Sequence, residues 1–320
     1  MDTFLRQLGQ KLAEQWLSLL VLPGALYLAV AATARVLGHR HALDPSWLAT
    51  RITEWAGSPT AAHSGGQVLL LAAVLAGAAT VGLAARALGA GLEGAVLAAD
   101  WRAWPFAARH WAARRTSRRR QRWIRRAQRY ETACDDAAAR LAAGDPPDPA
   151  PRIAAYQALL AVAPDLPDRP TWTGDRIHAA ATRLQREYHL EIAVLWPHLW
   201  FVLPEHARGE LTAARQELSK ATVLGGWALL YAPLAWWWWP AAPLALGIAL
   251  TARRRTRAAA DTYAELIEAL VRLHTGELTV QLGITEVVGR LTPALGEALT
   301  AELSPLPPDT RIPDDRHPLP

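Results

Sequence analysis

A run of 32 uncharged residues, Ala221–Ala252, constrains the fold of this chain more than any other feature. One membrane-spanning helix needs about 20 apolar residues and two need about 40, so length alone leaves one span or a hairpin open. Pro233 and Pro240 bracket four consecutive tryptophans, a residue type that prefers the membrane–water interface. We therefore expect a turn of a transmembrane hairpin, with interfacial side chains, at Trp236, Trp237, Trp238 and Trp239.

The positions of the arginines also favour the hairpin. The uncharged run is followed directly by Arg253, Arg254 and Arg255, and the earlier segment 101–130 holds eleven arginines and no acidic residue. Basic residues accumulate on the cytoplasmic side of membrane proteins. A hairpin returns both basic segments to that side, whereas a single span would place the second cluster outside the cell.

Two more apolar runs precede the basic segment. Residues 16–37 and 67–90 are each long enough to cross a bilayer, and the loop between them carries Trp47 and Trp55. The first run has a competing interpretation as a cleaved signal peptide, because Ala32-Thr33-Ala34 has the pattern of a cleavage site. Glycines recur through the second run and suit close packing of helices in lipid.

The segment 101–130 has two competing interpretations. Its arginines and interleaved tryptophans suit either nucleic-acid phosphates or the anionic head groups beside a membrane. Because the segment follows the span 67–90 closely, we favour the membrane and expect no nucleic-acid partner. The predicted membrane-surface residues of this segment are Arg114, Arg115, Arg118, Arg119 and Arg120, joined by the three arginines after the hairpin, and its predicted interfacial residues are Trp101 and Trp104.

The remaining chain is patterned as helices separated by prolines. Helices are predicted at 152–162, at 175–189 with Thr173 as N-cap, from Pro204 onward, and at 258–282. Residues 192–202 fit a strand or an apolar wedge, and 304–320 is a proline-rich tail expected to be disordered. In the helix 258–282, a stripe that includes Leu270 and Leu273 is expected to pack on the helix 175–189.

These patterns together predict an all-α polytopic membrane protein with four transmembrane helices. Its parts are the N-terminal pair of spans in 1–99, a basic helical cytosolic domain at 100–220, the hairpin at 221–252 and C-terminal cytosolic helices at 253–303. Both termini are expected in the cytoplasm.

A set of short motifs resembles a bacterial family of uncharacterised integral membrane proteins. The motifs are Thr173-Gly174-Asp175, Tyr188, Leu195-Trp196-Pro197-His198-Leu199-Trp200 and Leu203-Pro204-Glu205, followed by the membrane hairpin. The chain departs from that family at His189, where the family tends to have glycine, and at His198, where it tends to have arginine. The resemblance covers about 170–283; it implies a membrane architecture and no activity.

No catalytic or cofactor motif occurs in the sequence. There is no zinc-protease motif, phosphate-binding glycine loop or hydrolase nucleophile elbow, and the single Cys134 excludes an internal disulfide. Arg86 and Glu93 are two helical turns apart near the end of the second span and are read as interfacial. We expect no enzyme, no cofactor and no metal.

The expected function is therefore binding. The most distinctive residues outside the spans form an aromatic and proline-rich segment, with candidate docking residues Trp196, Pro197, Trp200 and Pro204. We expect a protein of the bacterial inner membrane whose cytosolic domain anchors or recruits a cytosolic protein, or senses the bilayer. The alternative is a pore-forming or channel-like effector of a bacterial conflict system, which would act as a homo-oligomer.

Overall fold

The computed structural model describes residues 21–56, 64–284 and 289–304, and these residues form helices and no strand. The predicted all-α fold is confirmed. The chain divides into two compact units, one of Met1–Ile177 with Thr212–Tyr263 and one of His178–Leu211 with Ala264–Pro320. The division falls inside three helices, α8 (Trp172–Tyr188), α10 (Glu205–Tyr231) and α11 (Ala241–Gln281).

The first unit begins with three helices, α2 (Leu22–Leu37), α3 (Pro45–Ala56) and α5 (Ser64–Leu97). Helix α2 packs on α5 at Gly24, where an added Cβ would lie 2.0 Å from the backbone oxygen of Ala78. Only glycine permits this approach, because any side chain would overlap the facing backbone. The part of the predicted first span that precedes residue 21 lies outside the described residues, as does the tail after residue 304.

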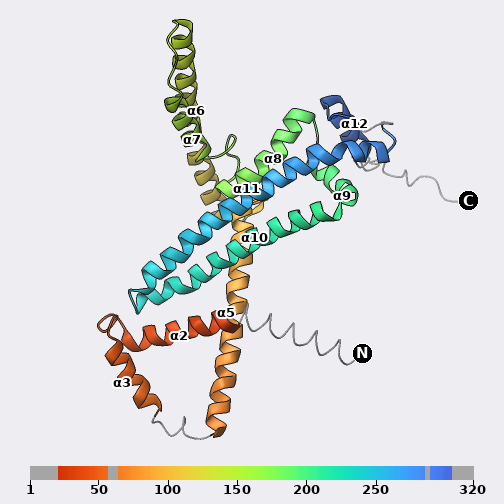
Figure 1. The fold of residues 1–320 in the computed structure, drawn as a ribbon. Coiled ribbons are helices and arrows are strands. Elements are labelled where there is room, and N and C mark those ends of the chain that lie inside the picture. Colours follow the sequence, from red (N-terminus) through yellow and green to blue (C-terminus); the bar gives the residue numbers. More distant parts are fainter. Residues whose placement is uncertain (1–20, 57–63, 285–288, 305–320) are drawn as a thin grey trace, which may run out of the picture. The chain divides into compact units, whose positions relative to one another are not determined.

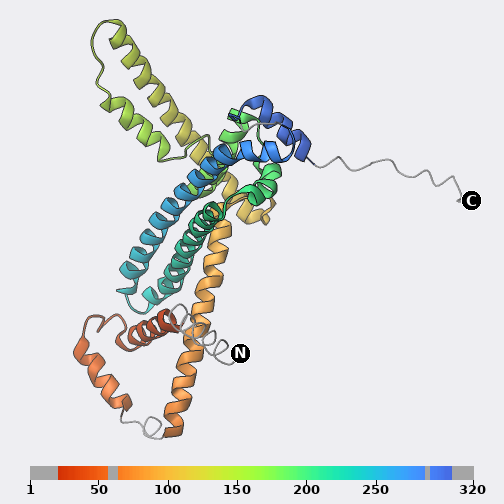
Figure 2. The same cartoon turned by 45° about the vertical axis from the view of Figure 1, so that its right-hand side comes forward.

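The uncharged run forms two helices joined by a turn. The parts of α10 and α11 in the first unit lie side by side in opposite directions, connected by the 3₁₀ helix η3 (Ala232–Trp236) (Figures 1 and 2). The core of this reversal is Tyr231, Leu234, Ala241 and Ala245, which are buried together. Partly buried residues of α2, among them Tyr27 and Val30, pack against this core.

Helix α5 also packs closely on α10 through glycines. A Cβ added to Gly89 would lie 2.6 Å from the Cα of Val223, and one added to Gly226 would lie 2.3 Å from the backbone oxygen of Ala85. By contrast, a Cβ added to Gly91 of α5 would have no described atom within 4 Å apart from the neighbouring backbone of its own helix. Some glycines of the second apolar run therefore bring two helices together, and others have open space beside them.

The basic segment forms one long helix with a partner. After the 3₁₀ helix η2 (Trp101–Ala103), α6 (Phe106–Ala142) runs through almost all of the arginines. Helix α7 (Ala150–Leu160) returns alongside it (Figures 1 and 2). The turn between them contains Gly144 with a φ of +79°, a conformation that favours glycine.

The second unit contains α9 (Ile192–Val202) and α12 (Pro293–Leu303), with the flanking parts of α8, α10 and α11. The strand interpretation of 192–202 is wrong. Leu195, Leu199 and Leu203 are buried and recur every four residues, a spacing that puts them on one face of a helix. Tryptophans and Pro197 stand between these leucines, so the segment is apolar on nearly every side. The sequence therefore does not single out the leucine face.

Two further predictions are corrected at helix boundaries. The N-cap of α8 is Thr171 and not Thr173, since the Thr171 hydroxyl accepts a hydrogen bond from the Gly174 amide at 3.0 Å. Residues 258–282 are not a separate helix, because α11 continues from the hairpin without a break. No proline or glycine stands between Thr251 and Gly276 to end it.

The predicted stripe of α11 is buried in part: Leu270 is 7% exposed, and Leu266 and Ile267 are half-buried. Leu273 is 69% exposed, whereas Val271 and Thr275 are fully buried in the second unit. Ion pairs also join α11 to α8 in the second unit: Arg183 with Glu268 at 3.5 Å, and Glu187 with Arg272 at 2.8 Å. Hydrophobic spacing alone could not reveal these charged partners.

Candidate functional site

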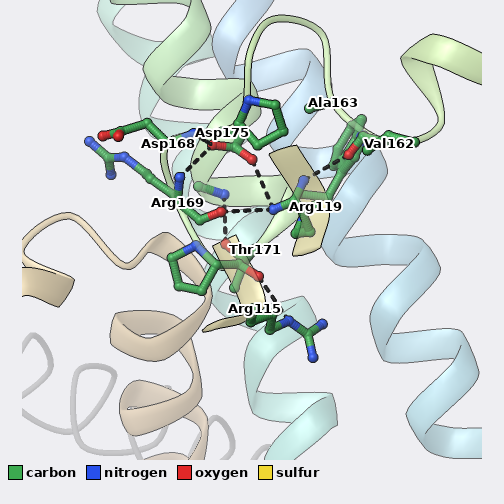
Figure 3. A network of polar contacts seen from close by, with 12 residues as sticks. Arg115, Arg119, Val162, Ala163, Asp168, Arg169, Thr171 and Asp175 are labelled. Carbon is green, nitrogen blue, oxygen red and sulfur yellow. Dashed lines mark hydrogen bonds and ion pairs between the residues drawn. The ribbon is translucent and has the colours of Figure 1, made fainter. Parts of the chain in front are cut away.

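Arginines of α6 hold the loop that connects α7 to α8, as Figure 3 shows. Arg119 is central, with a side chain only 11% exposed. Its guanidinium donates to the backbone oxygen of Val162 at 2.7 Å and to that of Arg169 at 3.0 Å. Arg119 was predicted to contact the membrane surface, but its guanidinium is covered by the loop. The loop covers it because these carbonyls and a buried carboxylate need its donors.

That carboxylate is Asp175, in the first turn of α8 and 4% exposed. Its Oδ2 lies 2.8 Å from a guanidinium nitrogen of Arg119, as an ion pair without good hydrogen-bond angles. Its Oδ1 accepts from the backbone amides of Asp168 at 3.0 Å and Arg169 at 2.8 Å. Burial raises the pKa of Asp175, although Arg119 and the two amides act in the opposite direction.

The composition of the loop explains the need for arginines. Residues 164–170 read PDLPDRP, and proline has no amide hydrogen, so the segment cannot satisfy its carbonyls by itself. Arg115 donates to Pro170 at 2.9 Å and Arg120 donates to Pro167 at 3.2 Å. Trp101 donates its indole N–H to Asp168 at 3.0 Å. We call Arg115, Arg119, Arg120 and Asp175, with the loop 161–171, the arginine clamp.

Beside the clamp lies a cavity of about 890 Å³, contained in the first unit. Part of its lining is basic, made by Arg253 and Arg257 of α11 and by a row of arginines of α6. The residues of that row are Arg114, Arg115, Arg118, Arg119 and Arg122. None of the described residues that line the cavity is an aspartate or glutamate. Other lining residues are apolar or small, contributed by α5, α10 and α11, and include Leu92, Val96, Ala228 and Ala249.

The arginines of this cavity are not equivalent. Arg115 and Arg119 are engaged with the loop, and the Arg257 guanidinium lies 4.8 Å from the ring centre of Trp172. Burial lowers the pKa of Arg257, and the nearby charge of Arg253 lowers it further. In the described part of the chain, Arg114, Arg118, Arg122 and Arg253 have no hydrogen-bond or ion-pair partner.

The other predicted membrane-surface arginines are solvent-exposed. Arg254 and Arg255 are exposed on α11 and do not line the cavity. Arg120 is exposed but belongs to the clamp. The sequence therefore identified most arginines of the site without separating structural ones from free ones. It did not identify Asp175 and Arg257 as site residues. The proline-rich loop PDLPDRP was the signal for Asp175, because its backbone carbonyls and amides need partners from elsewhere.

The predicted interfacial tryptophans lie in two places. Trp101 and Trp104 are half-buried near the start of α6, where Trp101 joins the clamp loop. In the hairpin turn, Trp236 is 83% exposed, and Trp237 and Trp239 are also exposed. Trp238 is turned inward and donates its indole N–H to the backbone oxygen of Ala42 at 2.9 Å.

The docking candidates lie in the second unit. Trp196 and Trp200 are half-buried, with ring centres 6.2 Å apart, and Pro197 is exposed between them on α9. Pro204 is half-buried just before α10. Phe201, beside Trp200, is 83% exposed and completes this surface, which we call the α9 aromatic face (Trp196, Pro197, Trp200 and Phe201).

The remaining ionisable candidates have structural partners. Glu93 forms an ion pair with Arg215 of α10 rather than with Arg86, which is exposed. His189 lies 2.8 Å from Glu297 in the second unit. The described residues contain no group of three or more histidine, cysteine, aspartate or glutamate side chains that could hold a metal ion.

Among the described residues, α5 alone is long and apolar enough to cross a membrane, and α2 and α9 are apolar but shorter. No family model, curated protein or solved structure matches the chain. The resemblance described from its motifs stays a prediction. His189, where the resembled family tends to have glycine, has a φ of +54°, in the left-handed region that favours glycine.

Proposed function

We propose that this chain is an integral membrane protein that crosses the bilayer four times, through α2, α5 and the two arms of the α10–α11 hairpin. The observation that carries this proposal is the exposed apolar surface of α5. Only 17% of its most apolar 18-residue window is buried. Val68, Leu69 and Leu70 are each more than 60% exposed. In water such a continuous surface would be costly, whereas in lipid it is the expected outer face of a bundle.

The contacts at the two ends of the first unit support one topology. At one end, the loop after α2 meets the hairpin turn: a ring nitrogen of His39 lies 2.6 Å from the backbone oxygen of Trp237, and Trp238 bonds to Ala42. At the other end, arginines of α6 and α11 line the same cavity. This arrangement suits tryptophans outside, arginines in the cytoplasm, and both termini in the cytoplasm.

Cysteine accessibility tests this topology. The variants carry one new cysteine each in a Cys134→Ser background, at three exposed positions: Lys220, Trp236 and Arg255. We expect an impermeant maleimide applied to intact cells to label only the cysteine at position 236. The other two should react only after the membrane is permeabilised. Labelling of position 255 in intact cells would exclude the hairpin topology.

We further propose that the cytosolic helices act by binding rather than by catalysis, and that the α9 aromatic face is the contact surface. This proposal is supported by the two different faces of the short helix α9, one buried and one exposed. Leu195, Leu199 and Leu203 fill the core of the second unit, while Phe201 and Pro197 point away from it. Exposed aromatic side chains beside a rigid packed face are typical of protein contact surfaces.

Paired substitutions separate binding from folding on this helix. Phe201→Ser is expected to leave the melting temperature unchanged, because the side chain is 83% exposed. It should abolish the cross-linking of those proteins that cross-link reproducibly to the native chain. Leu199→Ala is the contrasting variant: its side chain is fully buried, so we expect a loss of about 2–5 kcal/mol in unfolding free energy. An unchanged set of cross-linked proteins in the Phe201 variant would refute the docking role.

The pore-forming alternative predicts a different result when the purified protein is reconstituted into vesicles. A binding protein should leave salt-loaded vesicles tight at high protein density. Leakage that rises steeply with protein density would instead favour an oligomeric pore.

A further inference from the structure

The arginine-lined cavity has the composition of a site for an anionic amphiphile. Its basic part carries seven arginines and no acid, and four of those arginines lack a protein partner within the described residues. Unneutralised like charges held close together repel one another. The pKa of Arg119 is lowered by burial and also by the charges of Arg115 and Arg257. A multivalent anion would relieve this repulsion.

The partner-free arginines converge from two helices. Arg114, Arg118 and Arg122 follow one another at intervals of four residues, so they stand on one face of α6. Arg253 of α11 lines the same cavity. Guanidinium groups present planar pairs of N–H donors that match phosphate oxygens, and an ammonium group would not offer this geometry.

The apolar wall argues against a free phosphate ion as the ligand. Ala221, Gly225 and Ala228 of α10 line the cavity at intervals of four and three residues, so this wall is made by small side chains. Leu92 and Ala249 add apolar surface from α5 and α11. A phosphate ion would use only the basic part, whereas a hydrocarbon chain would fill the groove that these small residues leave.

We infer that this cavity binds an anionic phospholipid, with its head group on Arg114, Arg118 and Arg253 and the first part of an acyl chain against Ala228 and Ala249. Its volume, about 890 Å³, lies within the range of ligand pockets. Basic pockets among the cytoplasmic ends of transmembrane helices suit anionic head groups. This inference rests on the proposed membrane topology for the source of the ligand, but binding itself is measurable apart from it.

The test measures lipid retained by the purified full-length protein in detergent, by native mass spectrometry, after addition of phosphatidylglycerol or phosphatidylcholine with identical chains. We expect preferential retention of phosphatidylglycerol. The triple variant Arg114→Gln, Arg118→Gln, Arg253→Gln should lose about 100-fold in affinity for it. The control triple Arg125→Gln, Arg126→Gln, Arg129→Gln removes the same charge from exposed residues of α6 outside the cavity, and should keep the affinity.

A second pair of variants tests the apolar wall. Ala249→Phe places an aromatic ring in the cavity with every arginine intact, so we expect it to displace the lipid. Leu250→Phe changes the adjacent residue, which does not line the cavity, and should retain the lipid. If glycerol 3-phosphate at equal concentration displaces the lipid, the site is one for soluble phosphates and the lipid assignment is overturned. Equal losses in the two arginine triples, or retention by Ala249→Phe, would overturn it as well.

Membrane insertion is read separately, by resistance of the wild-type protein to extraction with alkaline carbonate. Extraction of the protein would contradict the proposed topology. The comparison of lipid affinity among the arginine variants in detergent would still be valid. A failure of the proposed topology can therefore be distinguished from a failure of the proposed lipid site.

Discussion

Replacing Asp175 with alanine is expected to lower the free energy of unfolding by about 3–5 kcal/mol. The change leaves the Arg119 guanidinium buried without its counter-charge, and it removes the acceptor of the Asp168 and Arg169 amides. The loop 161–171 should lose its shape together with the stability. Thermal unfolding of the detergent-solubilised protein provides the measurement.

Two further variants show whether the ion pair is the cause. Asp135→Ala removes an exposed carboxylate of α6 and should change the melting temperature little. In the double variant Asp175→Ala, Arg119→Met, no buried charge is left unpaired, so its loss should be smaller than the sum of the two single losses. Additive losses would mean that Arg119 and Asp175 act independently, contrary to the geometry of the clamp.

Gly89→Ala is expected to destabilise the first unit by about 1–3 kcal/mol or more, since the new methyl group meets the backbone of α10. Its Cβ would lie 2.6 Å from the Val223 Cα and 3.0 Å from the Val223 nitrogen. A backbone cannot rotate out of the way as a side chain can. Helix α10 would have to move away from α5, and the thermal unfolding transition should fall accordingly.

Gly91→Ala on the same helix is the matched control. Apart from the neighbouring backbone of its own helix, no described atom lies within 4 Å of the added methyl, and alanine favours a helix over glycine by about 1 kcal/mol. The control should therefore be neutral or stabilising. Similar destabilisation by both alanines would show that α5 and α10 do not approach each other at Gly89.

The helical nature of the chain was predictable because its signals are local. Proline positions and apolar periodicity each act over a few residues, and they located α7 and the turn between α10 and α11. The helix α9 was not recognised because apolar residues surround it on nearly every side, so no single face stood out. The continuity of α11 was missed because the arginine cluster at 253–255 was treated as a boundary, although arginine favours helix.

The candidate site was predictable only in part, because burial depends on partners distant in sequence. Arg118 and Arg119 are neighbours in an arginine run and look alike in the sequence. Only the fold shows that Arg119 is covered by a loop some 45 residues later and faces Asp175, while Arg118 opens into the cavity. The glycines also depend on distant partners. Gly89 and Gly91 have similar sequence surroundings, but only Gly89 is faced closely by another helix.

The contacts between the loop after α2 and the hairpin turn determine the order in which contacts can form while the chain is synthesised. His39 and Trp237 are 198 residues apart, and Ala42 and Trp238 are 196 apart. Ribosomes add about 5–20 residues per second, so roughly 10–40 seconds pass between the appearance of the two partners. The contact between α2 and α5 through Gly24 and Ala78 becomes available much earlier. The newly made N-terminal helices should therefore pair first and wait, with one side uncovered, for the hairpin to arrive.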